Sequence, residues 1–247
     1  MTAQAILQDM SLCMECQGCR VACQMQNGLA PDQVYIRFRF HEQGSYPKVT
    51  HHIGRFTCLH CTEAACIKVC PTGAVYKGET ALTHFDGAKC SGCGYCAEAC
   101  PFQIPQVKAD KALRCTGCEQ LTENGKSPAC VATCMAGALS FGSADEMLQK
   151  AEKRVAALKK QHPNAQVYSP AGVGGTHLIW VLRDSPTVYG LPTAPELPVS
   201  LGVWKDAVQP AGKLAMAGTL LLAGLGFVIA RRNHLRETHE GGAKHEG

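Results

Sequence analysis

The chain of 247 residues is poor in aromatic side chains and carries little net charge. Phe, Trp and Tyr make up 6% of it, and the formal net charge is only +4. Charge this slight and this scattered argues against nucleic-acid binding, which uses a basic face. Residues 1–10 lack the features of a secretory signal peptide, and no nucleophile with a partner base stands out. We therefore expect neither an export signal nor a catalytic site on this chain.

Cysteine, by contrast, is abundant and grouped. The sixteen cysteines form four groups of four: Cys13, Cys16, Cys19, Cys23; Cys58, Cys61, Cys66, Cys70; Cys90, Cys93, Cys96, Cys100; and Cys115, Cys118, Cys130, Cys134. Groups one and three read C-x2-C-x2-C-x3-C, and Pro101 follows group three. In bacterial ferredoxins this run binds [4Fe–4S] clusters, with three thiolates on one cluster and the fourth on its neighbour. Four thiolates per cluster predict four [4Fe–4S] clusters and electron transfer.

Groups two and four depart from this spacing. Group two has a longer gap between Cys61 and Cys66 but keeps the Cys70-Pro71 pair, whereas group four has eleven residues between its second and third cysteines and Met135 in place of proline. The cysteine loops also contain Gly18, Gly92, Gly94 and Gly117, and glycine permits sharp turns at little cost. The motif is therefore clear in three groups and inferred in the fourth.

The spacing between groups predicts how they pair. Only nineteen residues separate groups two and three, which suits a compact two-cluster unit, and groups one and four are left to complement each other. With crossed ligands, the four predicted sets are Cys58, Cys61, Cys66 with Cys100; Cys90, Cys93, Cys96 with Cys70; Cys13, Cys16, Cys19 with Cys134; and Cys115, Cys118, Cys130 with Cys23. This predicts two pseudo-symmetric ferredoxin-like units.

Three other uses of cysteine fit less well. A disulfide framework is typical of short secreted chains, and structural zinc uses two separated pairs rather than runs of three cysteines plus a fourth. A covalent c-type haem is excluded because no C-x-x-C pair is followed by histidine. All four sets are complete without histidine, so we expect His41, His51, His52, His60 and His84 to be surface or loop residues.

The fold class predicted for residues 1–142 is α+β, built from short elements. We expect strands at 34–40, with one face buried, at 74–76 and at 138–141, and single helical turns at 66–70 and 96–100. With so few aromatic residues, the clusters themselves are expected to serve as core, and the apo-protein should be poorly folded.

Residues 143–203 have a different character and are expected to pack on partners. Ser143 and Glu146 form a capping box that predicts a helix ending before Pro163, with an apolar stripe and a basic outer face. A strand is predicted at 177–182, and four prolines in 185–198 predict an extended arm. The glycines of 172–175 lack the G-x-G-x-x-G spacing, so we interpret them as a tight turn.

Residues 204–232 are predicted to form a transmembrane helix. Leu214–Ala230 contains seventeen residues without a charge, and Trp204 suits the membrane interface. The small residues Ala211, Ala215, Thr219 and Ala223 recur every fourth position, a stripe that lets membrane helices pack closely on a partner. Basic residues after the span place the tail, 233–247, in the cytoplasm and the cluster domain on the periplasmic or outer face. Without its own signal, the domain would be exported folded, with a partner.

Several stretches beyond the cysteines resemble a known family. They are Tyr168–His177 (YSPAGVGGTH), Tyr189–Pro192 (YGLP), Trp204-Lys205 and the single C-terminal span. Together with the four cysteine groups they resemble the β subunit of membrane-bound formate dehydrogenases, over nearly the whole chain. The resemblance implies a complex with a catalytic subunit that carries a molybdenum or tungsten pterin cofactor, and with a membrane b-type cytochrome that reduces quinone. This chain would relay electrons between them.

Three alternatives stay open at this point. The chain also fits the iron–sulfur subunit of a membrane-bound nickel–iron hydrogenase, or the electron-transfer subunit of another molybdopterin enzyme that reduces sulfur compounds or sulfoxides. A stand-alone polyferredoxin is the third, although a diffusing carrier needs no membrane anchor.

Overall fold

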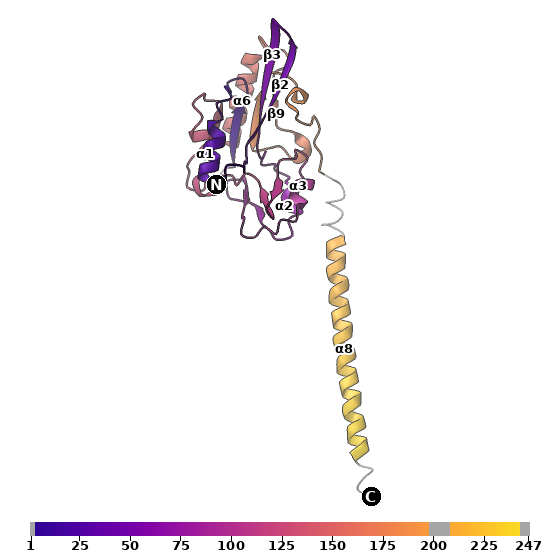
Figure 1. Ribbon diagram of the computed structural model, residues 1–247. Helices are drawn as coiled ribbons and strands as arrows, with labels where there is room; N and C mark the ends of the chain where they lie inside the picture. Colours follow the sequence, from indigo (N-terminus) through magenta and orange to yellow (C-terminus); the bar gives the residue numbers. More distant parts are fainter. Residues whose placement is uncertain (1–2, 198–207, 243–247) are drawn as a thin grey trace. The chain divides into compact units, whose positions relative to one another are not determined.

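The computed structural model describes residues 3–197 and 208–242 and divides the chain into two units, Met1–Pro198 and Val199–Gly247 (Figure 1). The first unit mixes short strands and helices, as the α+β prediction requires, and the second contains one long helix. Trp204 and Lys205 lie outside the described residues.

A four-stranded sheet organises the first unit. Its strands are β1 (Gln4–Asp9), β8 (Leu139–Ser143), β9 (Gln166–Tyr168) and β10 (Leu178–Leu182), in the order β8-β1-β10-β9. The pair β1 and β10 is parallel, and the two outer pairs are antiparallel. Every residue of β10 (LIWVL) is buried, as an unbroken apolar run requires when both faces of a strand are covered.

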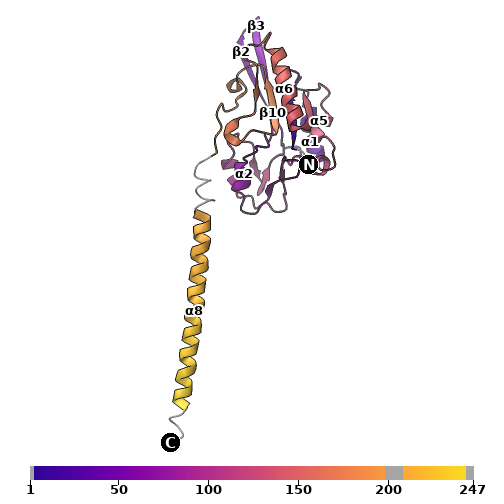
Figure 2. The same ribbon diagram turned by 180° about the vertical axis from the view of Figure 1, so that it is seen from behind.

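The two faces of this sheet pack against different partners. On one face, helix α6 (Ala144–Leu158) buries Met147, Ala151 and Val155 against residues of β1 and β10 (Figure 2). On the other face, Trp180 of β10 packs edge-on against Phe56, with ring centroids 5.6 Å apart. The predicted capping box of α6 is confirmed, because the Ser143 hydroxyl accepts a hydrogen bond of 3.3 Å from the Glu146 amide.

Short hairpins, the nine-residue helix α1 and four single helical turns surround the cysteine groups. The hairpins are β2 (Arg37–Ser45) with β3 (Lys48–Phe56), β4 (Val75–Lys77) with β5 (Thr83–Phe85), and β6 (Gln106–Lys108) with β7 (Lys111–Leu113). The helices are α1 (Gly18–Gln26), α2 (Ala65–Lys68), α3 (Tyr95–Glu98), α4 (Glu119–Thr122) and α5 (Ala129–Ala132). The turns predicted in groups two and three are thus present. The strand predicted from residue 34 begins at Arg37, and most of β2 is exposed rather than buried on one face.

Two expectations for residues 143–203 need revision. The segment 185–198 was predicted to be an extended arm, but Pro186–Tyr189 form a short 3-10 helix, η2, and Tyr189 and Leu191 are buried in the core. Proline is tolerated in the first turn of a helix, so the proline count misled the prediction. In addition, α6, β9 and β10 belong to the same unit and sheet as β1, so residue 142 marks a change in cysteine content rather than a boundary between separate units. The glycines at 172–175 do form a turn: Gly172 lies within the 3-10 helix η1 (Ala171–Val173), and Gly174 and Gly175, which follow it, have positive φ angles.

The second unit is helix α8 (Gln209–Gly242), in which Pro210–Arg232 is long and apolar enough to cross a membrane. Its leucines at 220, 221 and 222 are about 70% exposed, as expected of a surface suited to lipid. The helix continues ten residues beyond Arg232, where a separate tail was predicted. Leu, Arg and Glu in this stretch are good helix formers, and the glycine pair at 241–242 ends it.

Candidate metal centres

Three cavities of the first unit are each lined by one quartet of cysteines. We name each quartet by its first cysteine. The Cys58 site contains Cys58, Cys61, Cys66 and Cys100; the Cys90 site contains Cys90, Cys93, Cys96 and Cys70; and the Cys13 site contains Cys13, Cys16, Cys19 and Cys134. Each cavity therefore combines three cysteines of one group with the last cysteine of another, which is the crossed arrangement expected from the spacing.

The remaining four cysteines, Cys115, Cys118, Cys130 and Cys23, also come together, and we name them the Cys115 site. Burial, followed by the nearby Cys130 and Cys118 thiolates, raises the pKa of Cys23 to about 12. Burial and then Cys23 raise the pKa of Cys115 as well. These effects indicate that the thiols of this quartet lie within electrostatic reach of one another, and of Cys19 and Cys58 in the neighbouring sites.

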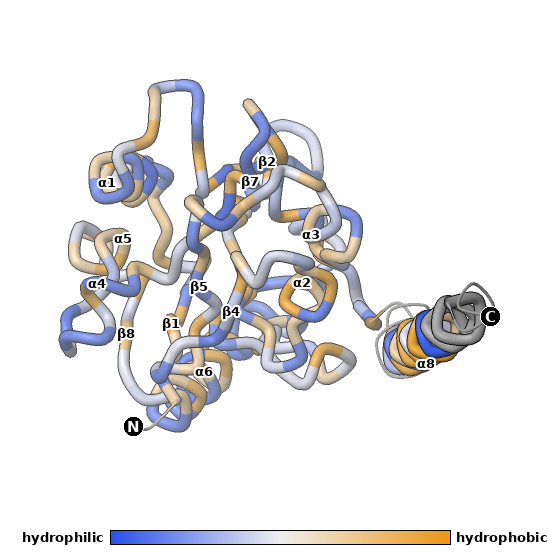
Figure 3. The backbone as a smooth tube through the Cα atoms, turned by 90° about the horizontal axis from the view of Figure 1, so that it is seen from below, coloured by the Kyte–Doolittle hydropathy of each residue, from blue (hydrophilic) through white to orange (hydrophobic). Residues whose placement is uncertain are grey.

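The helices explain how distant cysteines meet. Cys23 lies on α1 and Cys130 on α5, and these two helices pack against each other; α2 and α3 form the corresponding contact between groups two and three (Figure 3). The strands β1 and β8 are antiparallel neighbours, so Cys13, just after β1, lies beside Cys134, just before β8. Crossed ligand sets thus follow from pairing elements across the sequence.

The cysteine loops turn sharply, but only partly where glycine occurs. Gly92 has a φ of +69°, and a Cβ atom there would lie 2.4 Å from the Asp110 carbonyl oxygen, so glycine is required. Gly18 has no such conformation. In group one the positive φ angles belong to Glu15 (61°) and Gln17 (55°), which sequence inspection did not single out.

The chemistry of these quartets fits a metal cluster. Burial is the main cause of the raised pKa values of Cys61, Cys100 and Cys118, because it disfavours the thiolate. Iron and most other metals bind cysteine as the thiolate, and four buried thiolates need positive charge to compensate them. Residues that line each cavity therefore suit a group that supplies several cations at once, as a [4Fe–4S] cluster does.

Two buried arginines lie beside the quartets. Arg55, 2% exposed, donates from Nε to Cys19 Sγ at 3.4 Å and from Nη1 to Gln8 Oε1 at 2.7 Å. Burial acts to lower its pKa, but the Cys130 and Cys19 thiolates outweigh burial and raise it. Arg55 therefore lies between the Cys13 and Cys115 sites. Its Nη2 has no hydrogen-bond partner among the described residues, which is consistent with a cluster as its neighbour.

Arg114 has the equivalent position between the Cys58 and Cys90 sites. It is 1% exposed, and its Nη2 lies 3.7 Å from Cys58 Sγ. Burial again acts to lower the pKa, and thiolates of Cys58 and the Cys90 site outweigh it and raise it. Neither arginine was predicted as a site residue. The only sequence signal is that Arg114 directly precedes Cys115 and Arg55 lies three residues before Cys58.

His60 lies between the Cys58 and Cys115 sites. Its Nδ1 accepts a hydrogen bond of 3.0 Å from the Thr83 amide, so the ring proton is on Nε2, which lies 3.6 Å from Cys115 Sγ. Burial and the positive charge of Lys77 hold the pKa of His60 well below its usual range, which keeps the ring neutral.

The expectation for the histidines was therefore only partly right. His41 and His51 are exposed, but His52, His60 and His84 are 3% exposed or less. These rings are buried because each packs on an aromatic ring or a cysteine loop, which no local spacing reveals: His52 contacts Tyr189, for example, with ring centroids 5.4 Å apart.

Comparisons with known proteins agree with this chemistry. Residues 49–144 match the family model described as "4Fe-4S dicluster domain". The chain is similar to the formate dehydrogenase iron–sulfur subunit of Haemophilus influenzae, with 38% identity over 88% of this chain and 77% of the relative, and to the nitrate-inducible formate dehydrogenase iron–sulfur subunit of Escherichia coli K12, with 38% identity over 90% and 83%. It is also similar to the thiosulfate reductase electron transfer subunit of Salmonella typhi, with 39% identity over 57% and 76%. The chain binds multiple [4Fe–4S] clusters, and it belongs to the family of formate dehydrogenase iron–sulfur subunits.

Proposed function

We propose that this chain is the electron-transfer subunit of a membrane-bound formate dehydrogenase and relays electrons one at a time through four [4Fe–4S] clusters. The observation that carries the proposal is the gathering of twelve of the sixteen cysteines around three cavities, with the other four cysteines within electrostatic reach of one another. Formate dehydrogenase relatives align over 88% and 90% of the chain, against 57% for the thiosulfate reductase relative, which favours formate as the substrate of the catalytic partner.

The ligand sets we propose are the four crossed quartets. Each fourth cysteine (Cys100, Cys70, Cys134 and Cys23) would hold the cluster of the neighbouring group in its unit. Support comes from the cavity linings for three sites and, for the Cys115 site, from the mutual effects of its thiols on their pKa values.

The sites fall into a linear order. Arg114 is next to both the Cys90 and the Cys58 site, and Arg55 is next to both the Cys115 and the Cys13 site. The Cys58 and Cys115 sites are also neighbours, because the Cys58 thiolate helps to raise the pKa of Cys115. We infer that electrons pass along the order Cys90, Cys58, Cys115 and Cys13, or the reverse.

Each bound cluster would gain and lose one electron without a change in its ligands. The chain's own residues would provide the environment for this step. Arg55 and Arg114 supply fixed positive charge between sites, which offsets the negative charge of the thiolates. The Lys77 ammonium adds another positive charge beside the Cys58 site. It donates hydrogen bonds of 2.7 and 2.8 Å to the carbonyl oxygens of Cys61 and Ala81. Burial of these groups excludes water and keeps their electrostatic effects strong.

The partners we propose are a catalytic subunit with a molybdenum or tungsten pterin cofactor and a membrane b-type cytochrome on which α8 docks. The span Pro210–Arg232 supports this, as does its stripe of small residues at 211, 215, 219 and 223. The hydroxyl of Thr219 donates to the Met216 carbonyl oxygen at 2.8 Å, so it leaves no unsatisfied polar group in lipid. Arg231 and Arg232 support a cytoplasmic C-terminus with the cluster unit on the opposite side.

Anaerobic purification of the intact complex tests the proposal. We expect about sixteen iron atoms per chain, a stoichiometric pterin subunit, and reduction of the clusters by formate in electron paramagnetic resonance spectra. A large partner containing nickel, or reduction by hydrogen instead of formate, would replace the formate proposal with a hydrogenase one. Protease added outside spheroplasts should digest the cluster unit; complete protection would reverse the orientation.

A further inference from the structure

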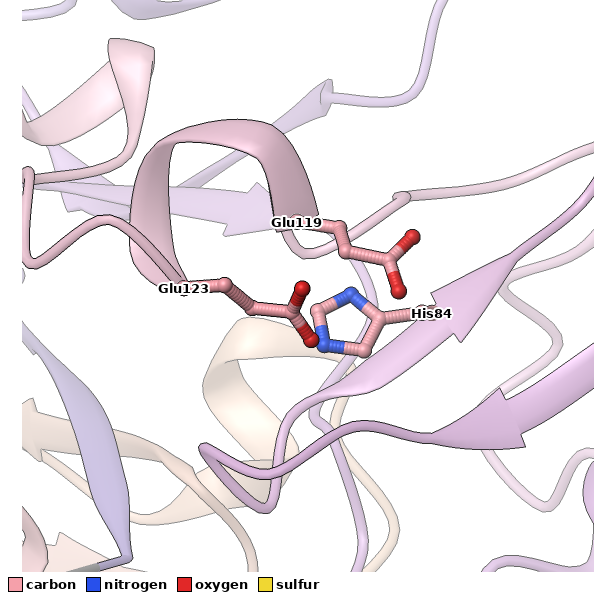
Figure 4. Close-up of side chains that lie close together, drawn as sticks. All are labelled: His84, Glu119 and Glu123. Carbon is pink, nitrogen blue, oxygen red and sulfur yellow. The ribbon is translucent and has the colours of Figure 1, made fainter. Parts of the chain in front are cut away.

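We propose that the first unit contains a second kind of metal site, which binds a single divalent first-row cation through His84, Glu119 and Glu123 (Figure 4). His84 extends from β5, Glu119 is the first residue of α4, and Glu123 directly follows α4. One ligand atom from each residue lies within 4.8 Å of the other two. None of the sixteen cysteines takes part, so this His84 site is independent of the cluster assignment.

The strongest evidence is the state of the His84 ring. The residue is 0% exposed, and its Nδ1 lies 2.8 Å from the Thr116 carbonyl oxygen. A carbonyl only accepts hydrogen bonds, so Nδ1 carries the proton and Nε2 has a bare lone pair. That buried Nε2 has no hydrogen-bond partner in the described part of the chain. Histidine ligands of metals have this arrangement: one nitrogen donates to a backbone carbonyl, and the other binds the ion.

The two carboxylates supply the charge that such an ion needs. Glu119 and Glu123 are four residues apart, a spacing that puts their side chains on one face of the turn, and both extend towards the His84 ring (Figure 4). Among residues 3–197 and 208–242, neither forms an ion pair. Two uncompensated negative charges beside a bare imidazole nitrogen attract a cation.

Tyr76 holds one of these carboxylates in place. Its hydroxyl lies 2.7 and 2.6 Å from the two oxygens of Glu119 and donates to them. A carboxylate oriented by a neighbouring donor is the second feature common to metal ligands.

Glycine at position 78 keeps the space in front of Nε2 open. A Cβ atom on Gly78 would lie 2.3 Å from His84 Nε2 and 3.1 Å from Glu123 Oε1. A side chain at this position would therefore occupy the place beside both candidate ligand atoms, and glycine leaves that place unfilled. Because the φ of Gly78 is not in the left-handed region, backbone conformation does not account for glycine here.

One imidazole and two carboxylates favour an ion such as Zn²⁺, with water completing the coordination, over soft metals that select thiolates. The bound ion would join α4, which directly follows Cys118, to the β4–β5 hairpin, which follows group two. It would thereby clamp the loop of the Cys115 site to the other ferredoxin-like unit.

Equilibrium dialysis of the cluster-loaded complex against Zn²⁺ tests this site, after weakly bound metal has been removed with a chelator. We expect about one zinc per chain with unchanged iron content. Glu123→Gln should weaken zinc binding at least about tenfold. Glu152→Gln, which replaces an exposed glutamate on α6, is the matched control and should bind zinc as the unmodified protein does.

A second variant, Gly78→Ala, and a second measurement, the unfolding temperature, test the same site independently. Gly78→Ala should also prevent zinc binding, by occupying the space at Nε2, and zinc should raise the unfolding temperature of the unmodified protein but not of either variant. Equal zinc binding by Glu123→Gln and the unmodified complex would overturn the proposal. So would the retention of no zinc, or the loss of iron as zinc enters.

Discussion

The cysteines of the Cys58 and Cys90 sites come from residues 58–100, whereas those of the Cys13 and Cys115 sites come from residues 13–23 and 115–134. The first pair closes over a short piece of chain with small hairpins. The second pair closes only when β1 has paired with β8 and α1 has packed on α5. Closing a longer loop costs more conformational entropy, so the second pair depends more on the rest of the fold.

The comparison shows that quartets with similar cysteine spacing depend on different parts of the fold. The Cys58 and Cys90 sites are closed by local segments and share a buried arginine, Arg114, although Leu59 also accepts a hydrogen bond from Leu178 of β10. The Cys13 and Cys115 sites need the sheet as well, because β1 and β8 bring Cys13 and Cys134 together, and Gln8 of β1 positions Arg55. Four predictions test this comparison.

The largest effect should come from cysteine variants that test the crossed ligands. Cys23→Ala should remove the cluster of the Cys115 site, and Cys70→Ala the cluster of the Cys90 site, each with a loss of about four iron atoms. Combining Cys23→Ala with Cys118→Ala should cost no more iron, because both residues belong to one site. Combining Cys23→Ala with Cys16→Ala should cost about eight. The reverse result in an iron assay would mean that groups one and four are not crossed.

A substitution in the four-stranded sheet should show whether the two pairs of sites lose iron at different guanidinium concentrations. Trp180 on β10 is fully buried, and Trp180→Ala should cost about 3–5 kcal/mol of stability. We expect guanidinium to release iron first from the Cys13 and Cys115 sites, because their ligand-bearing segments are far apart in the chain and meet through the sheet, and later from the other two sites. Val107→Ala, at a residue 42% exposed on β6, is the control and should leave the release curve unchanged. Release of all the iron in one phase would show that the two pairs are equally dependent.

Arg55 and Arg114 should each affect the reduction potentials of different clusters. A reduced cluster carries one more negative charge, so the nearby guanidinium favours reduction, and its removal lowers the reduction potential. Arg55→Gln should lower the potentials of the Cys13 and Cys115 sites, and Arg114→Gln those of the Cys58 and Cys90 sites. The shift should be on the order of 100 mV, for charges several ångströms apart at an effective dielectric constant of about 20.

Redox titration followed by electron paramagnetic resonance measures these shifts, with iron content as a check that clusters are retained. Arg55→Lys keeps the charge and should shift the potentials less. Unchanged potentials in Arg55→Gln and Arg114→Gln would show that the buried arginines serve packing alone.

The smallest effect should come from the cap of α6, which covers only the sheet. Ser143→Ala removes the hydroxyl that accepts from the Glu146 amide and should cost about 1 kcal/mol. The unfolding temperature should fall by about 2–4 °C. Ser127→Ala, at an exposed serine that caps no helix, should leave it unchanged. An equal fall in both variants would indicate that the cap contributes nothing specific.

Local patterns predicted much of the fold because they act over a few residues. The capping box at Ser143 placed the start of α6, and the apolar run at 177–182 placed β10 to within a residue. The same local reasoning failed at 185–198, where proline suggested an extended arm but Tyr189 found a place in the core. It also failed for His60 and His84, since histidine occurs in loops and in cores alike.

The number of cysteines, their spacing and the apolar C-terminal run are properties of the chain read in order. They were sufficient to predict iron–sulfur chemistry, the three cysteine quartets that line cavities and a helix able to cross a membrane. The positions of Arg55, Arg114 and His60 between sites, and the meeting of His84 with two glutamates, depend on contacts between residues far apart in the chain. Such contacts arise when β1 pairs with β8 and β10 and the helices pack in pairs, so no short stretch of sequence contains them.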